Sequence, residues 1–141
     1  MSSFLLDTNV LSETSRPRPD ERVLHWLGGL AQLKIPAVAL YELASGIRLL
    51  GPGDKRFFLE GWFDELLRSE PVIVPIDADA AFASADVAVL ARKQKRHVEH
   101  RDLLILGVAL SRGLTVSTRN VSHFRGLGVP VYNPFDGSLE A

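Results

Sequence analysis

The chain of 141 residues contains no cysteine at all. This absence excludes disulfide bonds, thiolate metal sites and a cysteine nucleophile. An excess of charge of one sign is also lacking, because 16 Lys and Arg residues stand against 17 Asp and Glu residues. A protein without a global basic field does not attract nucleic acid over its whole surface. Any contact with nucleic acid must therefore come from a local patch.

Long hydrophobic runs are missing as well. The longest, residues 103–110, is far shorter than the roughly 20 residues that a membrane helix needs. The first residues lack a basic segment followed by a long apolar one, so we expect no signal peptide and a cytoplasmic protein. Hydrophobic residues still make up 46% of the chain, which is enough for a core. Together with the length, this predicts one domain over residues 1–141.

Short apolar strands alternate with helical patterns along the whole chain. We predict strands over residues 4–6, 72–74, 114–117 and 129–132, with a further short strand ending at 36. We predict helices after Asp20 and over residues 37–50, 54–69, 77–97 and 101–112. This alternation favours an α/β sandwich of helices around a mostly parallel sheet.

Three acidic residues lie in apolar surroundings rather than on polar helix faces. Asp7 directly follows the strand 4–6, Glu42 lies among apolar and small residues, and Asp102 opens the most apolar helix. Each has a purely structural alternative. Asp7 and Asp102 could cap their helices, and Glu42 could be an exposed residue at a helix edge.

Taken together, the three acids favour a cation site. Burying several carboxylates near one another is tolerable only when a cation compensates them. Oxygen ligands without His or Cys suit Mg²⁺ or Mn²⁺. Asn120 is a fourth candidate, because Thr118-Arg119-Asn120 follows the strand 114–117, although Asn120 could equally cap a helix before Val121.

Four motifs in this order resemble the PIN domain: Leu6-Asp7-Thr8-Asn9, Glu42-Leu43, Asp102-Leu103-Leu104-Ile105 and Thr118-Arg119-Asn120. No single motif is specific, but the ordered set is, and it runs over essentially the whole chain. The segments 5–13 and 131–135 resemble, in addition, the FitB-like branch of the VapC-type toxins of type II toxin–antitoxin systems.

The resemblance implies a PIN-like α/β/α sandwich with its acidic site at the carboxyl edge of the strands. It implies a metal-dependent endoribonuclease that uses Mg²⁺ or Mn²⁺, with Asp7, Glu42 and Asp102 as the acidic triad. Asn120 falls at a fourth position that is Asp in many relatives, so tight binding of a second metal is in doubt. As partners it implies a VapB-like antitoxin, a homodimer, hetero-oligomers with the antitoxin, and DNA contacted only through that antitoxin.

The expected reaction is hydrolysis of an RNA phosphodiester bond by a metal-activated water. Asp7 and Asp102 are expected to ligate the metal, Glu42 to orient or deprotonate the water, and Asn120 to position a water. Such a reaction leaves 5′-phosphate and 3′-hydroxyl ends.

The segment 92–101 is rich in positive charge and leads directly into Asp102. A basic stripe beside an acidic pocket predicts a path for the RNA backbone, with Arg92, Lys93, Lys95 and Arg96 as contacts and Arg119 within reach. The alternative is a solvated helix end, where the helix dipole favours cations.

Two other functions compete with the nuclease. A haloacid-dehalogenase-like phosphatase needs a second Asp two residues after the first, where this chain has Asn9. A PIN-like domain that has lost its metal would be an RNA- or protein-binding module, and the three acids argue against it. Nucleotide-cofactor functions lack support, because the chain has neither a P-loop nor a Gly-x-Gly-x-x-Gly motif after a strand.

Overall fold

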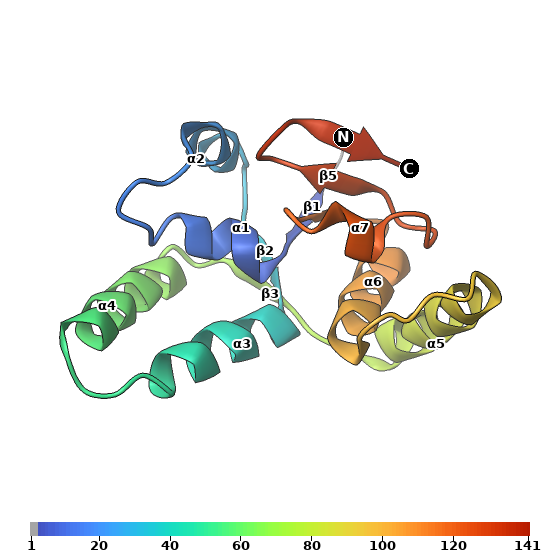
Figure 1. The fold of residues 1–141 in the computed structure, drawn as a ribbon, viewed down its shortest axis with the longest axis horizontal. Helices are drawn as coiled ribbons and strands as arrows, with labels where there is room; N and C mark the ends of the chain where they lie inside the picture. Colours follow the sequence, from blue (N-terminus) through green and yellow to red (C-terminus); the bar gives the residue numbers. More distant parts are fainter. Residues whose placement is uncertain (1–2) are drawn as a thin grey trace.

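A computed structural model describes residues 3–141 (Figure 1). The strands are β1 (Phe4–Leu6), β2 (Lys34–Pro36), β3 (Val72–Val74), β4 (Thr115–Ser117), β5 (Val131–Asn133) and β6 (Ser138–Glu140). The helices are α1 (Thr8–Glu13), α2 (Glu21–Gly28), α3 (Ala37–Arg48), α4 (Asp54–Arg68), α5 (Ala78–Lys93), α6 (His100–Arg112) and α7 (Val121–Phe124). Within the described chain, no helix is both long enough and apolar enough to cross a membrane.

The strands form two groups, of which the larger has the order β1-β4-β5-β6. β1 and β5 both pair with β4 in parallel, whereas β6 joins the edge antiparallel to β5. β2 and β3 form a parallel pair, and β2 lies beside β1. The predicted mostly parallel sheet is therefore confirmed, with one antiparallel edge strand that the sequence did not predict.

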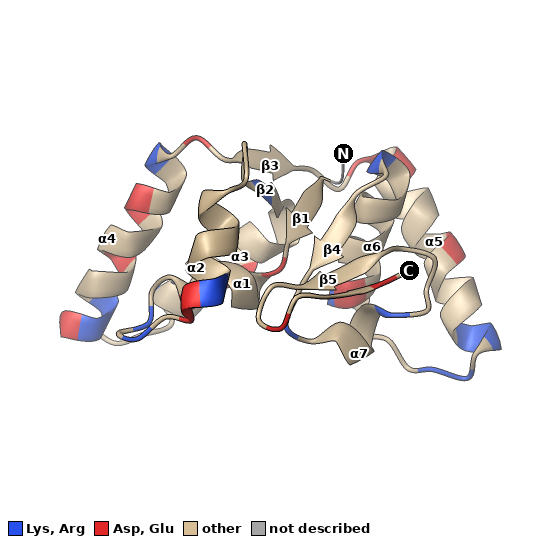
Figure 2. Cartoon of the chain, turned by 90° about the horizontal axis from the view of Figure 1, so that it is seen from above, with Lys and Arg blue, Asp and Glu red and all other residues tan. Residues whose placement is uncertain are grey.

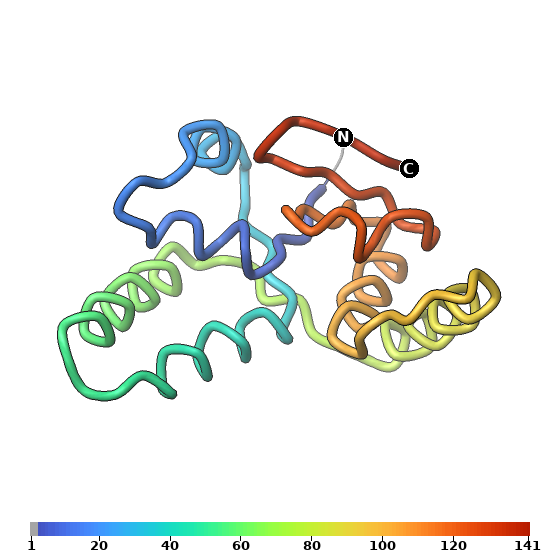
Figure 3. Tube along the Cα trace, in the orientation of Figure 1, coloured from blue at the N-terminus to red at the C-terminus, as the bar shows by residue number. Residues whose placement is uncertain are grey.

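Helices cover the sheet on both sides, and β1 shows why. Successive residues of a strand point to opposite faces, so Leu5 and Leu6 enter different hydrophobic clusters. The Leu5 cluster includes Ile105 of α6, and the Leu6 cluster includes Leu43 of α3. In Figure 3 the N-terminal half of the chain, blue to green, lies on one side of β1, and the yellow and orange half lies on the other. The predicted sandwich of helices around the sheet is confirmed.

The cap predicted for α5 is present, but this helix ends earlier than the sequence predicted. The Asp77 carboxylate accepts a hydrogen bond of 2.9 Å from the backbone N–H of Ala80, as expected of a cap for α5. α5 was predicted to run to His97, and it ends at Lys93. The cause is Lys95, whose φ of 57° lies in the left-handed region and turns the chain out of the helix.

Candidate functional site

The site begins where β1 and β4 end side by side. Because Leu6 pairs with Ser117 in parallel register, the next residues, Asp7 and Thr118, meet at the carboxyl edge of the sheet. The Thr118 hydroxyl donates a hydrogen bond of 2.8 Å to Asp7 Oδ2, with both side chains buried. An acid that is 1% exposed is thus fixed at the edge of the core.

Asp7 is at once a helix cap and a member of a charged cluster. Its Oδ1 accepts a hydrogen bond of 2.7 Å from the backbone N–H of Thr8 at the start of α1. The Asn9 amide lies 3.3 Å from Asp7 Oδ2, and it also bonds to the Thr118 hydroxyl. The cap that the sequence allowed is therefore present, and it does not exclude the second role.

Glu42 and Asp102 reach the same place from two helices. The hydroxyl of Thr8 donates to Glu42 Oε1 over 2.8 Å, which ties α3 to the start of α1. The side chain of Glu42 is 30% exposed and that of Asp102 is 5% exposed. Asp102 lies in the first turn of α6, but the residue at the cap position is Glu99, so Asp102 is not the cap.

All three acids converge on the guanidinium group of Arg101. Its Nε lies 2.7 Å from Glu42 Oε2, and its Nη1 lies 2.8 Å from Asp102 Oδ1. Its Nη2 donates to Asp7 Oδ1 and also lies 3.1 Å from the Thr8 hydroxyl oxygen. The structure thus brings the predicted triad together, around a cation that belongs to the chain itself.

The charges in this cluster govern how it behaves. Burial by itself would lower the pKa of Arg101, but its hydrogen bonds to Glu42, Asp7 and Asp102 and the negative charge of Asp7 outweigh burial and raise that pKa. Arg101 therefore stays charged. In the arrangement that the structure describes for residues 3–141, no three His, Asp or Glu side chains form a group that could hold a metal ion.

Asn120 is joined to the cluster through its backbone. Its backbone N–H donates to the Thr118 hydroxyl over 3.0 Å, while its exposed side chain forms no hydrogen bond among the described residues. It precedes α7 without a side-chain capping bond, so the predicted alternative of a cap is not seen. His123 lies closer, with its Nδ1 3.5 Å from Asp102 Oδ2.

The side chains predicted to contact RNA differ in exposure and in their hydrogen bonds. Arg92, Lys93 and Lys95 are exposed, and Figure 2 shows the basic end of α5 and the following loop beside α7. The guanidinium of Arg96 instead donates to the backbone carbonyls of Arg125 and Ser122, over 2.6 and 3.1 Å. Arg96 therefore joins this loop to the segment around α7.

Arg119 combines structural contacts with exposure. Its guanidinium carbon lies 4.1 Å from the centre of the Phe135 ring, a cation–π contact. Its backbone N–H donates to the Asn9 side-chain oxygen over 3.0 Å. The residue is exposed, and its backbone bond to Asn9 places it beside the acidic cluster.

Four residues of the cluster were not predicted as part of the site, namely Thr8, Asn9, Arg101 and Thr118. The hydroxyl and amide residues stand inside the two motifs that contain Asp7 and Asn120, and that was the signal available. Arg101 gave a misleading signal, because it ends a basic segment and so looked like one more exposed cation.

With this geometry in place, comparison with known proteins gives the family. The sequence model of the PIN domain matches residues 4–126. The chain belongs to the PIN domain family.

Individual relatives fit the same assignment. The chain is 34% identical to toxin FitB of Neisseria gonorrhoeae over 94% of its own length and 98% of FitB. It is 30% identical to VapC ribonuclease Y4jK of Sinorhizobium fredii, with the same shares covered. The crystal structure of FitAcB from Neisseria gonorrhoeae shares its fold with a TM-score of 0.84 and 33% identity, covering 94% of this chain and 98% of that one.

Proposed function

We propose that this chain is the toxin of a toxin–antitoxin pair and that it acts as a divalent-metal-dependent endoribonuclease. The observation that carries the proposal is the convergence of Asp7, Glu42 and Asp102 on one cationic group. The names of two relatives, a toxin and a ribonuclease, support the same activity. The expected location is the cytoplasm.

The donor set fits Mg²⁺ or Mn²⁺. Three carboxylates from separate elements already bind a single positive group, and hard divalent ions prefer oxygen ligands of this kind. A bound divalent ion would lower the pKa of a water molecule and neutralise charge on the phosphate. We assign the ligand role to Asp7 and Asp102, which are fixed by burial and hydrogen bonds.

The remaining steps belong to the side chains. Glu42, whose carboxylate is partly exposed, would orient the attacking water and accept its proton. Asn120 would position a water from the rim of the site. The water oxygen bonds to phosphorus, the bond from phosphorus to the 3′ oxygen breaks, and the products carry 5′-phosphate and 3′-hydroxyl ends.

RNA would approach along the basic residues beside α7. Arg92, Lys93 and Lys95 are free to contact phosphates, and Arg119 lies at the edge of the site. We expect Arg96 to contribute less, because its guanidinium is engaged by backbone carbonyls. Phosphate contacts of this kind are independent of sequence and weaken with salt.

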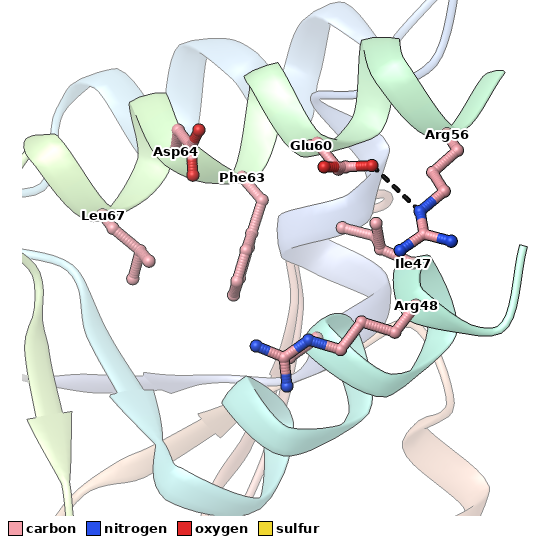
Figure 4. Close-up of a pocket in the computed structure, with 8 residues that line it drawn as sticks. Ile47, Arg48, Arg56, Glu60, Phe63, Asp64 and Leu67 are labelled. Atoms are coloured by element: carbon pink, nitrogen blue, oxygen red, sulfur yellow. Dashed lines mark hydrogen bonds and ion pairs between the residues drawn. The ribbon is translucent and has the colours of Figure 1, made fainter. Parts of the chain in front are cut away.

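A VapB-like antitoxin is the expected protein partner, and solved toxin–antitoxin complexes share this fold. A pocket of about 270 Å³ lies between α3 and α4, and Figure 4 shows the Phe63 ring between the two helices. Its walls combine apolar side chains with Arg48 and with the ion pair of Arg56 and Glu60, whose atoms are 2.9 Å apart. We propose this pocket as part of the antitoxin surface, with a homodimer as the expected toxin assembly and DNA contacted through the antitoxin.

The test is RNA cleavage by the purified chain, free of antitoxin, with Mg²⁺ or Mn²⁺. Asp7→Asn keeps the size and the capping oxygen of Asp7 but removes its charge, so cleavage should disappear while the fold remains. Asp86→Asn, an exposed residue of α5, is the matched control and should cleave like the wild type. EDTA should abolish cleavage in both active proteins.

Two results would count against this function. Products with 2′,3′-cyclic phosphate ends would rule out attack by water. Absence of cleavage with either metal, from folded protein, would favour the second candidate, a catalytically weak RNA- or protein-binding module. That candidate has one observation in its favour, since Arg101 already neutralises part of the acidic charge.

A further inference from the structure

We propose that Arg101 is an internal counter-cation of the site: its guanidinium binds the carboxylates that would hold the divalent ion, and it must swing out before that ion binds. The inference rests on the proposed nuclease function and adds a means of controlling it. The contacts of Arg101 would lower the affinity of the site for the divalent ion, and stronger contacts would lower it more.

The contacts use every nitrogen of the guanidinium. Nε bonds to Glu42, Nη1 to Asp102, and Nη2 to Asp7 and the Thr8 hydroxyl. A planar group that is matched to carboxylate oxygens on three sides forms charge-assisted hydrogen bonds, the stronger class of such bonds. Arg101 is therefore bound by the site as a ligand would be, although it is part of the chain.

Arg101 and a divalent ion compete for the same carboxylates. The two carboxylates proposed to ligate the metal each give an oxygen to Arg101, because Oδ1 of Asp7 binds Nη2 and Oδ1 of Asp102 binds Nη1. A second cation among these oxygens would lie within a few ångströms of the guanidinium and be repelled by it. Arg101 cannot avoid the conflict by losing its proton, because arginine stays charged in proteins. It has to move.

The position of Arg101 allows this movement. Its side chain is 28% exposed, whereas the Asp7 side chain is fully buried, so the guanidinium lies on the solvent side of the cluster. It belongs to the first turn of α6 next to Asp102, and a long flexible side chain can rotate there without moving the helix. Asp7 and Asp102 are fixed, and Arg101 is the part of the cluster that can leave.

The guanidinium lies between the three carboxylates and neutralises part of their negative charge. Its departure leaves negative charge that is costly to bury without a cation. Exit of Arg101 and entry of the divalent ion are therefore coupled events.

The first test measures binding of Mn²⁺ to the whole purified chain by calorimetry, without RNA. Arg101→Gln removes the competing charge but keeps a polar side chain, and Arg68→Gln on α4, an exposed arginine, is the matched control. We expect Arg101→Gln to bind Mn²⁺ on the order of tenfold more tightly than the wild type. The Arg68→Gln protein should bind like the wild type.

A second measurement follows Arg101 in the wild-type chain and uses a substituted protein only to assign the signal. The Nε–H of Arg101 is held by Glu42, so it should give a protected nitrogen–proton NMR signal in EDTA, assigned by its loss in Arg101→Lys. Titration with Mg²⁺ should remove or shift this signal in step with saturation. This keeps the inference testable even if Arg101→Gln fails to fold.

The outcomes separate the inference from the function on which it rests. If the wild type cleaves RNA with metal while the Arg101 signal stays unchanged, or Arg101→Gln binds Mn²⁺ no more tightly, the competition is disproved and the nuclease stands. If neither protein binds Mn²⁺ and neither cleaves RNA, both proposals fail, and Arg101 is a permanent structural partner of the acids.

Discussion

Two helix pairs, α5–α6 and α3–α4, flank the central sheet, and their helices pack with different closeness. In the α5–α6 pair, a Cβ atom built on Gly107 would lie 1.9 Å from the Ser84 hydroxyl and 2.5 Å from the Ala80 carbonyl, so the helices meet at backbone contact. In the α3–α4 pair, α4 buries no residue fully, and Phe57 is 81% exposed. The α5–α6 pair is thus joined at backbone contact, whereas α4 is packed less deeply. Both pairs leave apolar side chains exposed, Phe82 on α5 and Phe57 on α4.

The two helix pairs therefore contribute different features to the molecule. Asp102 lies on α6, and the close packing of α6 against α5 limits the movement of this acid. The α3–α4 pair carries a pocket and exposed aromatic side chains, which are the features of a surface awaiting a partner. Glu42 belongs to this second pair, so the site is assembled from both.

The sharpest way to test this comparison is one substitution made in both pairs. Gly107→Ala should lower the free energy of unfolding by about 2–3 kcal/mol, because its new Cβ would overlap the Ser84 backbone nitrogen at 2.7 Å. Gly61→Ala in α4, where a Cβ meets nothing within 4 Å, should raise it by about 0.5–1 kcal/mol. Urea unfolding measures both, and equal effects would refute the comparison.

A smaller effect is expected from the hydrogen bond that joins α4 to the end of α1. The Trp62 indole N–H donates to the Thr14 hydroxyl over 2.8 Å. Trp62→Phe should lower the free energy of unfolding by about 1 kcal/mol through loss of this bond, with some further loss of packing. A double-mutant cycle with Thr14→Val isolates the bond, and strictly additive effects would show that it contributes nothing.

The cap of α5 should contribute in a way that depends on pH. The hydrogen bond from the Ala80 backbone holds the pKa of Asp77 below its ordinary value of 3.8, and the charge of Arg112 adds to this. A carboxylate whose pKa is lower in the folded state stabilises it above about pH 3.8, and this is lost as pH falls further. Asp77→Ala should therefore be less stable than the wild type at neutral pH.

Acid unfolding curves of the two proteins supply the check, since their difference should shrink below that pH. Asp77→Asn is the control, because it retains a capping oxygen without the charge. A gap between wild type and Asp77→Ala that is constant down to the acid limit would contradict the lowered pKa.

The smallest effect on stability should come from the exposed face of α4. Phe57→Ser removes an aromatic ring that the chain itself does not bury. The free energy of unfolding should therefore change by less than about 0.5 kcal/mol. Self-association, measured by analytical ultracentrifugation, should weaken if this face meets a second copy. An unchanged dimer would place the dimer surface elsewhere.

Most elements could be predicted from the sequence, because apolar periodicity and caps are local signals. The strand Val72–Val74 and the cap at Asp77 are examples in which composition and neighbours agree. β6 (Ser138–Glu140) could not be predicted, since it is a polar edge strand that forms only because Val131–Asn133 offers it a partner. Its existence depends on tertiary pairing.

The site shows the same limit at the level of single side chains. The acids could be predicted because a carboxylate in an apolar stretch is unusual wherever it points. Arg96 and Arg101 stand in one basic segment, yet one binds backbone carbonyls and the other enters the acidic cluster. The environment of each arginine depends on where α6 begins relative to β1, and the local sequence does not contain that information.

The alternation in β1 has a consequence for how this chain tolerates insertions and deletions. Leu5 and Leu6 are held by different cores, and Asp7 follows at once. One residue inserted between Leu6 and Asp7, or one deleted from β1, would displace the carboxylate by about 3.3 Å and turn it to the opposite face. The length of this short stretch is thus as restrictive as the identity of the acid, so homologues should vary freely in the length of their surface loops but not here.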